Sequence, residues 1–198
     1  MRIFFATIFF TTFQLISFGQ KTFFCPNLLD IATKETRLFI SINPIKKINL
    51  KLSDTTYYRE YLKTEYEYNI DNGLLSELIQ KSSNIDTALW TEAEMKNFLL
   101  IKNVESLINT KDAVKKISIT DKIEIKKLKK RITDYNDSRP STENIYFFSR
   151  PIFDNTNTFA IISHGTGNKA AEGKDYISLF GFNGSCWVKL GVITRWIY

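Results

Sequence analysis

His164 is the only histidine of the chain, so any mechanism that needs an imidazole base must use it. Ser163 precedes it directly, but neighbouring residues of a strand point to opposite faces, so the two cannot act as a nucleophile and its base. A single histidine near the end of a strand is more often a satisfied surface or core residue than a catalytic group. We therefore assign no catalytic residue and retain His164 only as a candidate ligand-binding residue.

Paired carboxylates are a second route to catalysis, because a glycosidase needs two carboxyl groups about 5–10 Å apart across a cleft. Glu65 and Glu67 are two residues apart, as are Glu92 and Glu94. On a helix that spacing places the members of each pair on different faces. The sequence leaves open whether carboxylates from distant segments meet. An envelope hydrolase that uses His164 or a carboxylate pair therefore remains the alternative to a protein that only binds.

Neither a metal site nor a cofactor site is indicated. Cys25 and Cys186 are far apart, and no histidine accompanies them at zinc-ligand spacing. The segment from Gly165 to Lys174 contains glycines, but it lacks the Gly-Lys-Ser/Thr ending and the following helix that hold a phosphate. It is typical of a flexible hairpin loop. We predict no cofactor and no bound metal.

The excess positive charge of the chain lies in one stretch. The formal net charge is +6, and residues 111–131 contain nine Lys or Arg against three Asp or Glu, which alone is +6. Such a stretch is suited to nucleic acid, an anionic lipid or an acidic glycan. Nucleic acid is disfavoured because no stacking aromatic side chains are interleaved with the lysines. The other interpretation is a solvated face of an amphipathic helix.

That helix is predicted by an apolar stripe of Ile125, Leu128, Ile132 and Tyr135. Three lysines project from its opposite side and are candidate ligand-binding residues: Lys126, Lys127 and Lys130.

Further along, four aromatic residues at strand spacing are suited either to a ligand groove or, more often, to the core: Phe180, Phe182, Trp187 and Trp196. Among them Trp187 is retained as a candidate ligand-binding residue.

The first nineteen residues have the organisation of a secretion signal. Arg2 is followed by an uncharged run that ends in Ser17-Phe18-Gly19, with small residues at the −3 and −1 positions. The run is shorter and more polar than a membrane anchor. We predict cleavage after Gly19 and a secreted or periplasmic chain of residues 20–198 without a transmembrane segment.

Cys25 and Cys186 are the only cysteines of the chain. In an oxidising compartment such a pair is suited to a disulfide, which here ties the new N-terminus to the last hairpin. Two separate buried thiols fit the sequence equally well, because nothing in it shows that the two Cβ atoms meet.

Several elements must position these residues. Residues 37–52 alternate between apolar and polar and predict one or two strands interrupted at Pro44. Residues 55–68 suit a helix or a strand, whereas the leucines after Asp71 have helical spacing behind a capping residue. Thr91-Glu-Ala-Glu94 is a capping box, which predicts a further short helix.

From residue 144 onward the apolar period changes to two. It predicts four consecutive strands at 145–153, 158–163, 175–182 and 186–198. Asn183-Gly184 between the last two predicts a two-residue type I′ turn, in which both residues have positive φ.

This C-terminal segment resembles a pattern of small secreted, mostly uncharacterised proteins of Bacteroidetes-type bacteria. The pattern runs roughly S-x-P-x-F, then x-x-x-A-hydrophobic, N-G-x-W and W-I, and it is matched by Phe148-Ser-Arg-Pro-Ile-Phe153, Phe159-Ala-Ile-Ile, Asn183-Gly184 with Trp187, and Trp196-Ile. The resemblance covers about the last fifty residues and the helix before them. It implies a fold and an envelope location, but no activity. Related chains often carry a Cys-Gly-rich loop where this one has Gly165 to Lys174.

We therefore predict an α+β fold with short helices packed on a C-terminal four-stranded antiparallel meander. Residues 20–198 form one domain, helical or mixed over about 20–140 and β-meander over about 144–198. The expected function is non-enzymatic binding outside the cytoplasm, with an anionic envelope component or a protein as partner.

Overall fold

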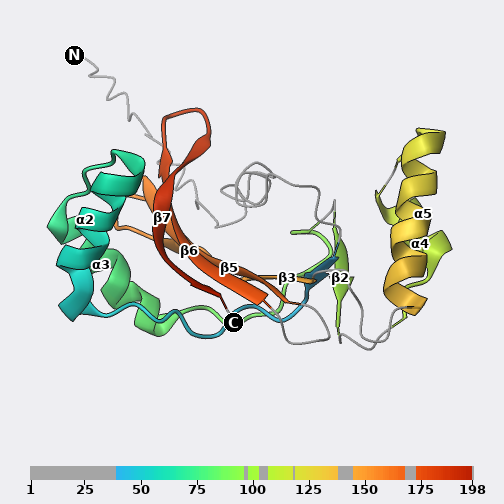
Figure 1. Ribbon diagram of the computed structural model, residues 1–198, viewed down its shortest axis with the longest axis horizontal. Coiled ribbons are helices and arrows are strands. Elements are labelled where there is room, and N and C mark those ends of the chain that lie inside the picture. Colours follow the sequence, from blue (N-terminus) through green and yellow to red (C-terminus); the bar gives the residue numbers. More distant parts are fainter. Residues whose placement is uncertain are drawn as a thin grey trace, which may run out of the picture.

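The computed structural model describes residues 39–95, 98–102, 107–117, 119–137, 145–167 and 173–197. Within these residues the chain forms α-helices and one seven-stranded mixed sheet (Figure 1). The α+β prediction is confirmed, but the sheet is larger than the predicted four-stranded meander. The predicted secretion signal lies outside the described residues, as does Cys25.

The elements follow one another in two groups along the chain. The first group is β1 (Phe39–Ser41), η2 (Leu52–Asp54), α2 (Thr55–Tyr66), α3 (Asn72–Lys81), η3 (Ser82–Asn84) and β2 (Leu99–Ile101). The second group is α4 (Thr110–Ile117), α5 (Lys122–Asp137), β3 (Ile145–Phe148), β4 (Ile152–Phe153), β5 (Phe159–Gly167), β6 (Gly173–Phe182) and β7 (Trp187–Ile197).

The C-terminal strands form the predicted antiparallel meander, and two more strands extend it. The sheet order is β2-β1-β3-β5-β6-β7, with β4 also paired to β5. β1 runs parallel to both β2 and β3, and all other pairs are antiparallel. The two extra strands have three residues each, and their neighbours in the sheet are distant in sequence.

The first predicted strand of the meander is divided into β3 and β4. Pro151 lacks the N–H that a continuous ladder needs. Ser149 fills the break: its N–H donates to the Ser163 carbonyl at 2.7 Å, and its buried hydroxyl accepts from the Ser163 N–H at 2.9 Å. Both halves therefore remain paired with β5.

The predicted helix after Thr91 is wrong. The capping-box hydrogen bonds do form, from the Thr91 N–H to Glu94 Oε2 at 2.9 Å and from the Glu94 N–H to Thr91 Oγ1 at 3.4 Å. The described residues Thr91–Met95 make only a turn, however, and the chain then enters β2. In β2, Leu99 pairs with Phe39.

The last hairpin turn is displaced by one residue from its prediction. The Asn183 N–H donates to the Cys186 carbonyl at 3.1 Å, so the two central residues are Gly184 and Ser185. Only Gly184 has a positive φ, of 91°, which is the arrangement of a type II′ turn with glycine first. Asn183 acts through its side chain, whose Oδ1 accepts from the N–H groups of Ser185 and Cys186.

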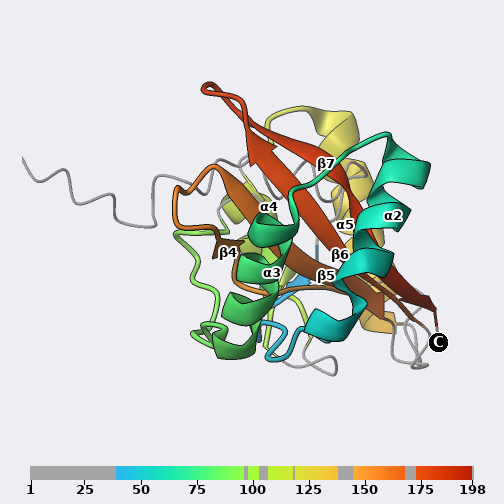
Figure 2. The same cartoon turned by 90° about the vertical axis from the view of Figure 1, so that its left-hand side faces the viewer.

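The α-helices of the described residues, α2 to α5, lie on one side of the sheet. In β3, Ile145 and Phe147 pack with α4 and α5, whereas Tyr146 and Phe148 point to the other side. Because Phe147 pairs with Gly165, the same side continues in β5 to Ile161, which packs with α2 and α3. Figure 2 shows α2 and α3 in front of the strands β5 to β7.

The opposite side of the sheet carries a second core. Side chains of β1, β3, β5, β6 and β7 meet three residues of the connection between α3 and β2: Trp90, Met95 and Phe98. The largest of these, Trp90, is fully buried. This connection therefore contributes three side chains to the core, although most of its other described residues are exposed.

α5 is held by the predicted stripe. Leu128, Ile132 and Tyr135 are buried against β1 to β3, and Ile125 is half-buried. In the part of the chain that the structure describes, no helix combines the length and the apolar character needed to cross a membrane.

Candidate functional site

His164 lies in the second core and is 8% exposed. Its Nε2 is 2.8 Å from Ser178 Oγ, and its ring stacks with those of Phe148 and Tyr176 at centroid distances of 6.1 and 5.4 Å. Burial, with a smaller contribution from the charge of Lys189, lowers the pKa of His164 from 6.5 to about 3. The imidazole is therefore neutral at physiological pH, and its packing keeps it from reaching a substrate in solvent.

Trp187 is a core residue. Its side chain is 1% exposed, and its ring lies 5.7 Å from Phe153 and 5.5 Å from Phe182 between centroids. The structure thus brings His164 and Trp187 to the same side of the sheet without opening either to a ligand.

The carboxylates named as a catalytic alternative have separate surroundings. Glu65 and Glu67 are exposed, and Glu67 ends α2 with a φ of 53°. Glu92 pairs with Lys116, whereas Glu94 pairs with Arg150. Among the described residues, no group of three His, Cys, Asp or Glu side chains is placed to hold a metal ion.

Cys186 is half-buried in the last turn, with its Sγ 3.7 Å from Asn183 Oδ1. Its predicted partner, Cys25, lies outside the described residues. The disulfide therefore stays a prediction.

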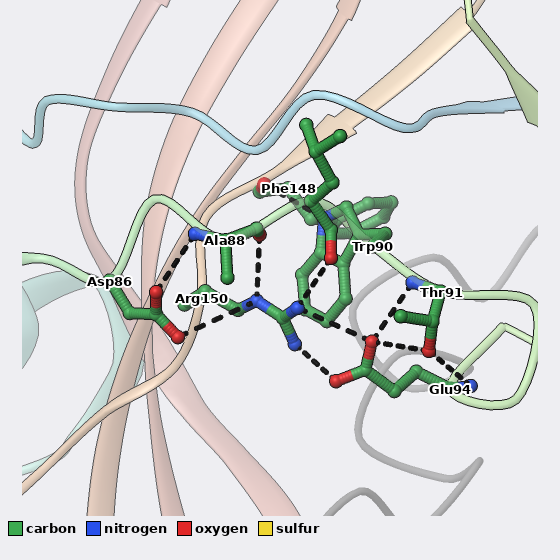
Figure 3. Close-up of polar contacts among 8 residues, drawn as sticks. Asp86, Ala88, Trp90, Thr91, Glu94, Phe148 and Arg150 are labelled. Atoms are coloured by element: carbon green, nitrogen blue, oxygen red, sulfur yellow. Dashed lines mark hydrogen bonds and ion pairs between the residues drawn. The ribbon is translucent and has the colours of Figure 1, made fainter.

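Arg150, which the sequence analysis did not name, is the centre of a polar cluster (Figure 3). Its Nη1 donates to Glu94 Oε1 at 2.5 Å, and its Nη2 donates to Glu94 Oε2 at 3.3 Å and to the Leu89 carbonyl at 2.8 Å. Its Nε donates to the Ala88 carbonyl at 3.2 Å, and its Cζ lies 4.0 Å from the Trp90 ring centroid. We call these residues, with Asp86 and Thr91, the Arg150 clamp.

The clamp leaves no guanidinium nitrogen free for a ligand. Burial raises the pKa of the Glu94 carboxyl, but the hydrogen bonds from Arg150 and Thr91 outweigh burial and hold that pKa below its usual value. Asp86 adds a second carboxylate, with its Oδ2 3.9 Å from Arg150 Nε. Trp90 completes the cluster by donating from Nε1 to the Phe148 carbonyl at 3.3 Å. The clamp therefore holds the α3–β2 connection over the second core.

One signal for the clamp is present in the sequence. Arg150 interrupts an apolar segment immediately before Pro151, where a charged residue on a strand path needs a partner. Nothing local identifies that partner, because Glu94 is distant in sequence and its capping box already accounts for it.

The basic stretch forms an exposed surface on α5. Five lysines of this helix are exposed, and we call them the lysine face: Lys122, Lys126, Lys127, Lys129 and Lys130. Within it Lys127 pairs with Glu124 at 2.7 Å, both side chains being largely exposed. Nearby, the Arg131 guanidinium lies 5.7 Å from the Phe39 ring centroid and so belongs to the packed side of the helix.

The lysine face is positioned by the buried stripe and by a cap. The carboxylate of Asp121 accepts from the N–H groups of Ile123 and Glu124 at 2.8 and 2.9 Å, which starts the helix. With 100° between successive residues, Lys126 and Lys130 then point away from Leu128 and Ile132. The three lysines selected from the sequence are thus exposed on the solvent side of α5.

Comparisons of the chain with protein-family models, with curated proteins and with solved structures found no match.

Proposed function

We propose that this protein is a non-enzymatic binding domain that acts in the periplasm or outside the cell. It attaches to an anionic component of the envelope through the lysine face of α5. The location follows from the predicted secretion signal, and the binding mode from the surface of the helix.

The observation that carries the proposal is the concentration of exposed lysines on one rigid helix. Lys126 and Lys130 lie one turn apart on the side of α5 opposite its buried stripe, and Lys127 is beside them. Positive side chains held this close attract polyanions and anionic surfaces more than they stabilise the fold. Only Lys127 among the five has an ion pair within the described residues.

The environment of His164 supports binding over hydrolysis. A general base works best with a pKa near the operating pH and within hydrogen-bond reach of its substrate. The ring of His164 is buried, stacked and hydrogen-bonded to Ser178, and its pKa is lowered to about 3.

The test compares two triple variants with the same loss of charge. Lys126→Gln/Lys127→Gln/Lys130→Gln removes the centre of the lysine face. Lys46→Gln/Lys47→Gln/Lys51→Gln removes three exposed lysines from the segment between β1 and η2. Binding to long-chain polyphosphate and to phosphatidylglycerol vesicles is measured for both variants and for the wild type.

The first variant should lose roughly a hundredfold in affinity, at about 1 kcal/mol for each lysine near an anionic surface. The control variant should bind nearly as well as wild type. Wild-type binding should weaken as salt rises, because ions screen exposed charges beyond about 8 Å at physiological ionic strength. Equal losses in the two variants would mean that net charge, and not the lysine face, governs binding.

A further inference from the structure

Ile123 lies among the lysines of the lysine face, and electrostatics does not explain the exposure of its side chain. Its side chain is 66% exposed, whereas Leu128 and Ile132 of the same helix are buried. At 100° per residue, Ile123 projects between the directions of Lys130 and Lys127 and one turn before Lys127. An apolar side chain is thus presented to solvent amid positive charges.

We infer that the anionic partner is the surface of a phospholipid bilayer, with Ile123 inserted at the boundary between headgroups and acyl chains. This inference rests on the proposed function and specifies its ligand. A soluble polyanion neutralises lysines but gains nothing from a neighbouring isoleucine. A bilayer offers both phosphate groups for the lysines and an apolar layer for Ile123.

The lysines suit the same arrangement. Their side chains lay apolar stems along an interface and keep their ammonium groups at the level of the phosphates. Asp134 and Asp137 lie in the last turns of α5, beyond the lysines, and Glu124 in the first turn is paired with Lys127. The N-terminal part of the helix therefore keeps an excess of positive charge and makes the contact. A flat surface can approach there, because Figure 1 shows α4 and α5 at the end of the molecule opposite α2.

Ile123→Asn separates this inference from the proposed function. Its matched control is Leu52→Asn, which changes a leucine that is 48% exposed in η2, next to α2. Binding is measured to vesicles of 30% phosphatidylglycerol in phosphatidylcholine, to pure phosphatidylcholine vesicles and to long-chain polyphosphate. An unchanged melting temperature verifies that each variant is folded.

Ile123→Asn should weaken binding to the anionic vesicles roughly tenfold and leave polyphosphate binding unchanged. Leu52→Asn should change neither, and wild type should bind pure phosphatidylcholine only weakly. Unaltered vesicle binding by Ile123→Asn overturns the insertion but leaves the proposed function standing. If wild type binds polyphosphate but not the anionic vesicles, the insertion is likewise overturned and the proposed function stands. The proposed function itself would be overturned only if Lys126→Gln/Lys127→Gln/Lys130→Gln also bound the anionic vesicles and polyphosphate as well as wild type does.

A second measurement reports depth directly. In Ile123→Trp, vesicles whose acyl chains carry bromine should quench more fluorescence than they quench in wild type, whose own tryptophans, Trp90, Trp187 and Trp196, give the baseline. Quenching equal to that of wild type would place residue 123 outside the apolar layer and overturn the insertion.

Discussion

At the scale of single residues, the second core depends on two polar side chains that are nearly enclosed. The Arg150 guanidinium meets a carboxylate, two carbonyls and an indole face, and its side chain is 12% exposed. His164 is enclosed in another way, as a neutral ring between aromatic neighbours. The stability of the fold should therefore depend on the hydrogen-bonding partners of Arg150 and, through His164, on pH.

Arg150→Ala should lower the free energy of unfolding by about 2–4 kcal/mol, because Glu94 then keeps only its hydrogen bonds from Thr91 and two carbonyl groups lose their donor. Arg150→Lys keeps the charge but lacks the planar fork, so it should recover only part of the loss. Urea denaturation measures both. A double-mutant cycle with Glu94→Gln should give a coupling energy above about 1 kcal/mol, and a coupling near zero would show that the pair is incidental.

His164 should make the folded state sensitive to acid. The unfolded chain binds a proton at this residue below about pH 6.5, whereas the folded protein does so only near pH 3. As pH falls through this window, wild type should lose up to about 1.4 kcal/mol per pH unit relative to His164→Gln. Above pH 7 the ring is neutral in both states and the difference should be constant. Parallel stability–pH profiles of the two proteins would contradict the buried, neutral imidazole.

At the scale of elements, local sequence patterns predicted some helices and strands and not others. The stripe of α5 and the Asp71 cap of α3 were predicted because both depend on neighbours in sequence. β1 lies within the segment 37–52 that was predicted as one or two strands, whereas β2 was missed. A strand of three residues has little local signal and is defined by its partner strands. The capping box formed as predicted without its helix, because Leu99 gains more from pairing with Phe39 in the sheet core.

The last hairpin gives a test of turn geometry. No atom lies within 4 Å of a Cβ built on Gly184, so a substitution there meets no steric obstacle except its positive φ of 91°. Gly184→Val should therefore destabilise the protein by at least about 1 kcal/mol. Gly184→Asn should be milder, because asparagine tolerates positive φ better. Equal melting temperatures for wild type and the valine variant would exclude a strained turn.

At the scale of the whole molecule, the antiparallel meander could be predicted from the sequence. The packing of the α3–β2 connection on the side of the sheet opposite the helices could not. Alternating residues and turn signals mark strands that follow one another directly. The α3–β2 connection carries no comparable signal, although Trp90 and Met95 fill the core opposite the helices. The candidate site shows the same division. Helical spacing predicted Lys126, Lys127 and Lys130 of the lysine face, whereas the burial of His164 and Trp187 depends on the assembled sheet.

The parallel placement of β1 between β2 and β3 bears on the order in which the chain folds. β5, β6 and β7 are joined by short-range antiparallel pairing, so they can associate as soon as they are made. β1 must instead find Leu99 of β2 and Tyr146 of β3, and closing such long loops is slow. We therefore expect the meander to form first and β1 to join the sheet later, through its pairing with β3.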